Sequence, residues 1–403
     1  MATVVWEDCD RDSQEVFYET TDEFAPDLSC DPHSFLVGCL FPAIYHGEQR
    51  IILDEPICPE LHNGLMTAMA WYRQWGLLGQ PIQVEASSSV RYPQAIAPRA
   101  GAFLSGGVDS LALLRANRLD FPHDHPNSVK DSIFVHGFDI GGLADNSDEA
   151  SQLELALKAV SSIAQDAHST LIPVSTNVRH LADDIPFWIY QFHGAALASV
   201  GHALAGRLTS VSIASGFRIA NLGPGGTHPL IDPNYGSANL RIRHEGILHS
   251  RLAKVDLISD WQAALDNLRV CTMNEPGTLN CGRCEKCLRT MLELLASGSL
   301  HKTTAFPHRN VYSHMLENIH FTEKYHDMWY ADLIPPLKAQ GRMDLVELIE
   351  RKRHEFHKRL MWQEERDWKG TVKRFDRRWL AGGLYNIYRT MRTARQFWPS
   401  QHT

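Results

Sequence analysis

The sequence lacks a long hydrophobic run. Its first residues, MATVVWEDCDRD, contain neither the basic segment nor the apolar segment of a secretory signal. The longest apolar candidate, FLVGCLFPAIY, is shorter than a membrane span and contains Pro42. We therefore expect a cytoplasmic protein with no membrane partner.

Cysteine is sparse outside one short segment, which holds four of the eight cysteines. The other four have no ligand spacing and are expected to be plain thiols: Cys9, Cys30, Cys39 and Cys58. In a reducing compartment, clustered cysteines indicate metal binding or chemistry rather than disulfides.

The 403 residues are enough for a large core, and the pattern predicts three parts. Residues 1–95 are expected to form a small α+β module with an acidic head. Within it we predict two strands around the HGEQ turn in 34–55, a helix over 60–76 and a strand over 82–87. The Pro/Arg-rich segment 91–101 marks the boundary.

Strands and helices alternate in the second part, residues 96–300. Predicted strands cover 100–106, 132–139, 169–176 and 208–216, and the longest predicted helices cover 148–167 and 187–206. This alternation predicts an α/β fold with a parallel sheet covered on both faces. Residues 301–403 are expected to be helical.

Charge is unevenly spread along the chain. Residues 7–31 hold ten Asp/Glu against Arg11 alone, whereas residues 351–403 hold fourteen Lys/Arg against five Asp/Glu. The basic tail contains aromatic residues, namely Trp362, Trp368, Phe375, Trp379, Tyr385 and Tyr388. It fits either a nucleic-acid contact or, as the favoured interpretation, a helical cap with a solvated charged face.

The stretch LSGGVDS, residues 104–110, joins a predicted strand to a predicted helix. Its glycines allow the backbone to approach an anion, and the helix N-terminus and the hydroxyls of Ser105 and Ser110 offer donors. Asp109 suits such a site only if a divalent cation bridges it to phosphates, which is a usual role of Mg²⁺. The segment is therefore predicted to hold phosphates, with a chance glycine turn that opens a helix as the alternative.

SGGVDS resembles the pyrophosphatase loop of the N-type ATP pyrophosphatases. The resemblance implies a Rossmann-like, adenine nucleotide α-hydrolase-like fold that binds ATP and Mg²⁺ and transfers AMP to a substrate oxygen. The loop residues that it assigns to the phosphates and Mg²⁺ are Ser105, Gly106, Gly107, Val108, Asp109 and Ser110.

The same resemblance extends to residues outside the loop. Lys254, in SRLAKVDLI, corresponds to a lysine that neutralises the α-phosphate. His136 and Asp139, after the second strand, are candidate adenine contacts, with a core histidine and a loop aspartate as the alternatives. Ser215 and Gly216, which end a strand, are expected to line the nucleotide crevice.

The second motif is CTMNEPGTLNCGRCEKCLRTM, with Cys271, Cys281, Cys284 and Cys287 in C-x9-C-x2-C-x2-C spacing. Four thiolates fit a closed tetrahedral Zn²⁺ site, which leaves no position for catalysis. An iron–sulfur cluster is the main alternative, although x3-C-P does not follow the third cysteine of the run. Free thiols are the remaining alternative.

Together the two motifs resemble the 7-cyano-7-deazaguanine synthases over about residues 100–298. That likeness implies activation of a 7-carboxy-7-deazaguanine-like acid by ATP, followed by amide or nitrile formation. It also makes Arg289, one residue earlier than in the family, a candidate catalytic residue. Longer relatives occur in antiviral defence cassettes, where a deazapurine is attached to a protein.

The expected substrate signature is replaced by GPGGTHPLIDPNYGSANLRIRHEG, residues 223–246. Its glycines and prolines predict irregular structure. Its polar residues are candidate contacts for a purine-like edge or a carboxylate, and they are His228, Asp232, Asn234, Arg241, Arg243 and His244. The alternative is a surface loop whose charges are solvated.

Three functions follow from these observations. The leading one is an AMP-forming carbon–nitrogen ligase that acts on a deazapurine-like acid, with ammonia or a protein amine as acceptor. The second is a tRNA-modifying enzyme of the same superfamily that binds RNA through the basic tail. The third is a nucleotide-binding interaction protein without turnover, which the intact loop disfavours. Homodimer formation is left open.

Overall fold

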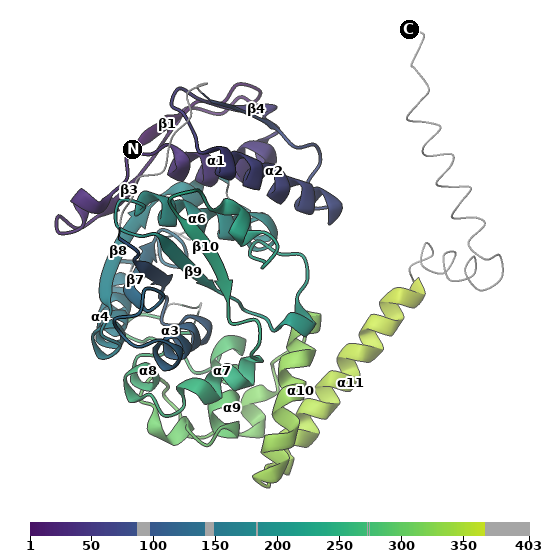
Figure 1. The fold of residues 1–403 in the computed structure, drawn as a ribbon. Coiled ribbons are helices and arrows are strands. Elements are labelled where there is room, and N and C mark those ends of the chain that lie inside the picture. Colours follow the sequence, from purple (N-terminus) through teal and green to yellow (C-terminus); the bar gives the residue numbers. More distant parts are fainter. Residues whose placement is uncertain (87–96, 142–148, 183, 272, 274, 367–403) are drawn as a thin grey trace. The chain divides into compact units, whose positions relative to one another are not determined.

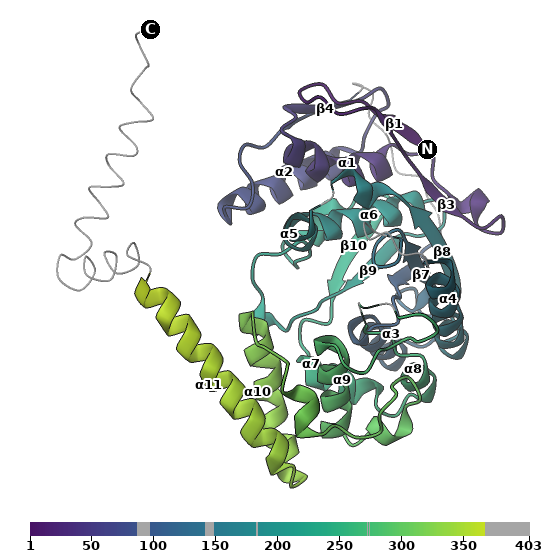
Figure 2. The same cartoon turned by 180° about the vertical axis from the view of Figure 1, so that it is seen from behind.

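The computed structural model describes residues 1–86, 97–141, 149–182, 184–271, 273 and 275–366. The chain divides into two compact units, Met1–Met315 and Leu316–Thr403, which are considered separately here. Figures 1 and 2 show the elements of both units from opposite sides.

The first unit is built on a six-stranded sheet in the order β10-β9-β6-β7-β8-β3. The strands are β3 (Tyr18–Thr20), β6 (Ala100–Phe103), β7 (Val129–His136), β8 (Thr170–Thr176), β9 (Ser210–Ala214) and β10 (Arg241–Glu245). All neighbours pair in parallel except β3, which pairs antiparallel with β8. The predicted α/β class and the four predicted strands are confirmed, and the sheet is mixed rather than purely parallel.

Helices cover both faces of this sheet (Figures 1 and 2). On one side, α6 (His193–Ala203) lies against the sheet, and α1 (His33–His46) and α2 (Pro59–Gln74) lie beyond it. The other side carries α3 (Val108–Asp120), α4 (Glu149–Asp166), α7 (Arg251–Ile258), α8 (Gln262–Asp266) and α9 (Glu285–Ala296). A three-layer arrangement of this kind buries both faces of the sheet.

The predicted strand over residues 34–45 is wrong, because this segment forms α1. Nearly every residue of α1 is buried, so its apolar run shows neither a period of two nor a period of 3.6. Pro42 lies inside the helix. The rest of the prediction is confirmed, since β4 (Arg50–Leu53) and β5 (Gln83–Ala86) pair in parallel across α2.

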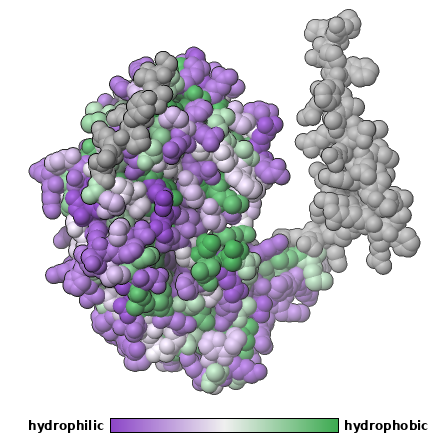
Figure 3. All heavy atoms as spheres, viewed as in Figure 1, coloured by the Kyte–Doolittle hydropathy of each residue, from purple (hydrophilic) through white to green (hydrophobic). Residues whose placement is uncertain are grey.

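The N-terminal residues share a core with the large sheet. The buried cluster joins Leu36 and Leu40 of α1 with Ile172 of β8 and Val211 of β9. Short strands β1 (Ala2–Val4) and β2 (Gln14–Val16) precede β3. On the face shown in Figure 3 the described surface is largely hydrophilic, with its strongest hydrophobic area near the middle of the view and smaller ones elsewhere.

Segment 223–246 also differs from its prediction as irregular. Residues 241–245 near its end form β10, which pairs in parallel with β9 from Arg241↔Ser210 to Glu245↔Ala214. A 3₁₀ turn, η5 (Asp232–Tyr235), precedes it. The glycines and prolines mark only the turns at the start of the segment, whereas the alternation of Ile242 with Arg241 and Arg243 is the pattern of a half-buried strand.

The predicted helix over 187–206 is confirmed with an interruption. It consists of α5 (Ile185–Phe187), a π-helical stretch at Trp188–Phe192 and α6. π-Helical turns often occur at functional sites, and this one brings Trp188 and His193 to the cavity described below.

In the second unit, α10 (Lys324–Ala339) and α11 (Met343–Arg366) pack together, as expected for a helical region. Trp362 is exposed near the end of α11. The other aromatic residues of the basic tail, Trp368, Phe375, Trp379, Tyr385 and Tyr388, lie outside the described residues. Among the helices described, none combines the length and apolar character of a membrane span.

Candidate functional site

The glycine loop follows β6, the third strand from the β10 edge, and leads into α3. Gly106 has φ +79°, a backbone conformation that favours glycine, and Gly107 is the N-cap of α3. The Ser110 hydroxyl donates to the Gly107 carbonyl oxygen (2.9 Å), and the Gly107 N–H donates to Ser105 Oγ (3.3 Å). The side chain of Val108 is buried, so only its backbone is suited to ligand contact. The loop and the start of α3 therefore lie at the carboxyl end of β6, where open parallel sheets commonly bind ligands.

Asp109 lies between two cations from α7. Its carboxylate accepts from Lys254 Nζ at 2.8 Å and from the Arg251 guanidinium at 2.8 Å. Ser250 caps α7 through the Ala253 N–H, and the spacing of three residues puts Arg251 and Lys254 on one face of the helix. Lys254, whose side chain is 2% exposed, also donates to the Ser215 carbonyl oxygen.

The two cations decide the charge of Asp109. Burial raises the pKa of Asp109, but Arg251 and Lys254 oppose this effect and hold the pKa below its usual value. The carboxylate is therefore ionised at neutral pH and can serve as a metal ligand. Two of the predicted catalytic residues, Asp109 and Lys254, are in direct contact.

Arg289, the third predicted catalytic residue, lies in the buried charge network around this pair, and its charge helps to lower the pKa of Asp109. It pairs with Glu285 (2.9 Å) and Glu293 (3.4 Å) along α9, and Glu293 pairs in turn with Arg251 (3.3 Å). Arg289 is buried and is not among the residues that line the cavity beside the loop. Its geometry is that of a positioning residue for Arg251.

A cavity of about 230 Å³ opens beside the glycine loop. Its polar residues are Ser105, Asp109, Ser110, Asp139, His193 and Arg269, and its apolar lining includes Phe138, Trp188 and Leu197. The lining comes from the carboxyl ends of β6, β7 and β9, where parallel sheets bind ligands. The lining thus combines charged and hydroxyl groups with aromatic rings.

The other predicted nucleotide contacts are arranged unequally around this cavity. Asp139 lines it, whereas His136 bonds to Glu149 (2.7 Å) and Ser175 (3.4 Å) and is not among the lining residues. Ser215 follows β9, and its carbonyl oxygen accepts from Lys254. Gly216 borders open space, because a Cβ atom there would meet no atom within 4 Å. Neither Ser215 nor Gly216 is among the residues that line the cavity.

The four predicted substrate residues do not come together. Asp232 is fully buried and bonds to the His228 N–H (3.1 Å) and to His244 Nδ1 (2.7 Å). His228 packs on the Trp75 ring, and burial lowers its pKa. Arg241 and Arg243 line a separate groove at the other end of the sheet. None of the four lines the cavity beside the loop.

The four motif cysteines form a compact group whose sulfur atoms all lie within 4.8 Å of one another. Two sulfur pairs, Cys271–Cys284 and Cys281–Cys287, are 3.9 Å apart. A tetrahedron with Zn–S bonds of about 2.3 Å has edges of about 3.8 Å, so a single zinc ion fits. A cluster of several irons would hold its thiolates farther apart, because each thiolate binds a different iron.

The cysteine site is tied to the glycine loop. Asn280 Oδ1 accepts from the N–H groups of Val270 and Cys271, which fixes the chain just before the first ligand. Arg269, two residues before Cys271, donates its N–H to the Gly106 carbonyl oxygen at 2.9 Å. Its side chain is buried and lines the cavity. Cys284 is the N-cap of α9, the helix that carries Arg289 and Glu293.

Purified protein is expected to contain about one zinc per chain and to be colourless, because Zn²⁺ has a filled d shell and its four thiolates complete the site. Elemental analysis and a visible spectrum test this expectation. Stoichiometric iron with visible absorption would show an iron–sulfur site instead.

Sequence reasoning missed Arg251, Glu293 and Arg269. Arg251 and Glu293 are spaced three and four residues from the predicted Lys254 and Arg289, which is the spacing of neighbours on a helix face. Arg269 carries no such signal, because its place depends on how the metal segment folds back on the loop.

No protein-family model matches the chain, and comparison with curated proteins and with solved structures found no match.

Proposed function

We propose that this chain is an ATP-dependent adenylating enzyme of the N-type ATP pyrophosphatase kind. The observation that carries the proposal is the loop Ser105–Ser110 at the carboxyl end of β6, with Asp109 held by Lys254 and Arg251 beside a cavity of about 230 Å³. A helix N-terminus, two cations and an ionised carboxylate are the groups needed to hold a triphosphate with its metal.

In the proposed reaction, a substrate carboxylate oxygen attacks the α-phosphorus of ATP. The new O–P bond gives an acyl adenylate, and the bond between the α-phosphorus and its bridging oxygen breaks to release pyrophosphate. A nitrogen nucleophile then attacks the acyl carbon, and AMP leaves. Asp109 would hold Mg²⁺, which would neutralise the charge of the leaving pyrophosphate.

The residues of α7 have a defined task in this scheme. Lys254 and Arg251 already neutralise one carboxylate, and a triphosphate entering the site offers them stronger acceptors. Because both side chains are largely buried, their charges act through little water on the charge that develops at the α-phosphate. Glu293 and Arg289 keep Arg251 in place.

The proposed substrate is a carboxylate of the 7-carboxy-7-deazaguanine kind, and the acceptor is ammonia or a protein amine. Incubation with ATP, Mg²⁺, this acid and ammonium is expected to yield AMP and pyrophosphate in equal amounts, with the amide visible by mass spectrometry. A nitrile would require a second ATP, which activates the amide oxygen so that it leaves with AMP. With a protein amine in place of ammonium, the product would be the protein adduct. 7-Deazaguanine, which lacks the carboxylate, is the matched control and should give neither AMP nor pyrophosphate. Release of ADP and phosphate would contradict the adenylating chemistry.

A further inference from the structure

A groove of about 690 Å³ lies at the opposite end of the sheet from the glycine loop. The residues that line it come just before strands or at their first positions: Pro98, Pro126, Asn127, Thr209, Ser210, Arg241 and neighbours in 233–240, with Glu60, Asn63 and Gly64 of α2. In a parallel sheet these positions share the amino-terminal edge, whereas the loop follows the carboxyl end of β6. The five residues of β9 alone span roughly 16 Å.

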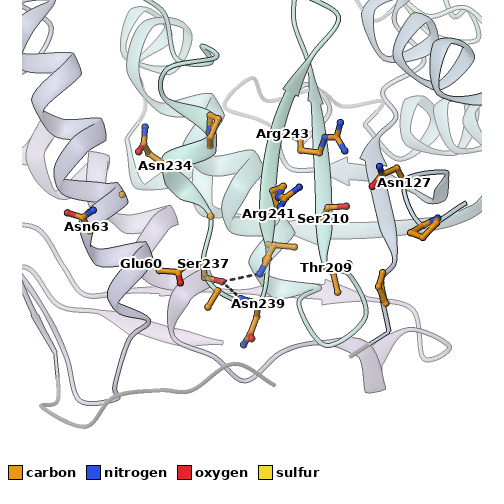
Figure 4. A pocket seen from close by; sticks show the side chains of 17 residues that line it. Glu60, Asn63, Asn127, Thr209, Ser210, Asn234, Ser237, Asn239, Arg241 and Arg243 are labelled. Carbon is orange, nitrogen blue, oxygen red and sulfur yellow. Dashed lines mark hydrogen bonds between the residues drawn. The ribbon is translucent and has the colours of Figure 1, made fainter. Parts of the chain in front are cut away.

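Arg241 and Arg243 supply the positive charge of the groove. They are two positions apart on β10 and therefore lie on the same face of the strand. Figure 4 shows Asn63 and Asn234 on one side of them and Asn127 on the other. Arg243 pairs with Glu245 (2.5 Å), whereas no carboxylate pairs with the exposed Arg241 among the residues that the structure describes.

The walls of the groove are firmly built. A Cβ atom at Gly64 of α2 would lie 2.1 Å from the Asn234 carbonyl oxygen, so the helix and the η5 turn are in backbone contact there. Ser237 Oγ accepts from the N–H groups of Asn239 and Leu240, which fixes the turn into β10. The backbone on the side of the groove formed by α2, η5 and the turn into β10 is therefore fixed.

We infer that this groove is a second binding site, for a small polyhydroxylated anion such as a sugar phosphate or a sugar acid. Arg241 offers a two-point contact to an oxyanion. Glu60 is an acceptor for hydroxyl donors, and the amides of the four lining asparagines can both donate and accept. The volume is within the range of small-molecule sites, and the lining is polar rather than apolar.

The ligand of the groove is a different molecule from the group activated at the loop, because the two sites lie at opposite ends of the strands. This inference stands apart from the proposed adenylating function. Binding at the groove and pyrophosphate release at the loop can therefore be tested separately, and failure of one does not decide the other.

The test is isothermal titration of the full-length protein with ribose 5-phosphate, gluconate and, as the neutral comparison, ribose. At least one anionic probe is expected to bind at least about 10-fold more tightly than ribose. The two anions distinguish a phosphate ligand from a carboxylate ligand. Arg241→Ser should weaken binding of that probe by about 10-fold or more, since it removes the unpaired guanidinium.

Two variants serve as controls, each checked for a folded circular-dichroism spectrum. Arg73→Ser changes another exposed arginine of the same unit, in the last turn of α2, and should leave binding unchanged. Asp109→Asn should also leave binding of the probe unchanged. Equal binding of ribose and both anions, or full binding by Arg241→Ser, would overturn the inference. Loss of binding in Asp109→Asn would assign the probe to the loop instead.

Discussion

Asp109→Asn is expected to lower pyrophosphate release from ATP by at least about 100-fold, the order of magnitude for removing one preorganised charge partner of a transition state. The amide is nearly the same size as the carboxylate but is a poor ligand for Mg²⁺. Release is measured with a coupled pyrophosphate assay at saturating ATP. Turnover at the wild-type rate would contradict the role assigned to this residue.

The same substitution is expected to destabilise the first unit. The neutral amide would leave Lys254 and Arg251 without their shared counter-charge, and Lys254 is almost fully buried. Removing one partner of a buried ion pair costs about 3–5 kcal/mol, and the cost here is smaller because the Asp109 side chain is 27% exposed and Arg251 keeps Glu293. A matched double variant, Asp109→Asn with Lys254→Met, should recover part of the lost stability without recovering activity.

The pH dependence of stability gives a second signature of this carboxylate. The pKa of Asp109 is lower in the folded chain than the ordinary value of 3.8, so the folded state binds its proton less readily than the unfolded state does. The contribution of Asp109 to the free energy of unfolding is therefore present above pH 3.8 and is lost as the pH falls toward the pKa of the folded state. Chemical denaturation between pH 3 and pH 6 should show a steeper acid loss for the wild type than for Asp109→Asn.

The local patterns predicted the central part of the fold well. The strands that became β6, β7, β8 and β9 were recognisable as short apolar runs between helices. Segment 34–45 was not, because α1 is buried on nearly all sides and its apolar residues show no period. β10 was missed because the glycines and prolines before it obscured a five-residue alternation. The pairing of β3 with β8 joins residues about 150 positions apart, which no local pattern shows.

The candidate site also contains residues that a local motif predicts and residues whose positions depend on how the chain folds. Residues within one motif, such as Ser105 to Ser110 and the four cysteines, are together in space because they are together in sequence. Lys254 was reachable from its own short motif and does meet Asp109. His228, Asp232, Arg241 and Arg243 share one segment, which is why the sequence groups them. His228 and Asp232 lie in turns that fold inward, whereas the two arginines lie on one face of β10. Only the arginines reach an open surface.

Cys284→Ser is the variant expected to have the largest effect on the folded state. Hydrogen bonding from the neighbouring Cys287 thiol lowers the pKa of Cys284 and favours the thiolate that a metal needs. Serine keeps the N-cap of α9 but is a poor zinc ligand at neutral pH. Zinc content should fall well below one per chain, and the melting temperature should fall with it, because ligation free energy is folding free energy in such segments.

Loss of the metal should also affect the proposed nucleotide site. The metal segment holds Arg269 against Gly106 from one side, and α9 holds Arg251 through Glu293 from the other. ATP affinity, measured by titration at a temperature where the variant remains folded, should therefore fall by about 10-fold or more, which corresponds to about 1.4 kcal/mol. Cys30→Ser, at an exposed cysteine outside the cluster, is the control and should match the wild type in zinc, stability and ATP affinity.

Arg269→Lys separates the two contributions of the metal segment. It keeps a positive charge and the backbone N–H that bonds to Gly106, but it loses the planar guanidinium at the cavity. Zinc content and melting temperature should stay near the wild-type values while ATP affinity falls. If Cys284→Ser loses zinc and yet binds ATP as the wild type does, the metal does not position the loop. A Cys284→Ser protein with full zinc and normal stability but no turnover would instead make Cys284 a reacting thiol rather than a ligand.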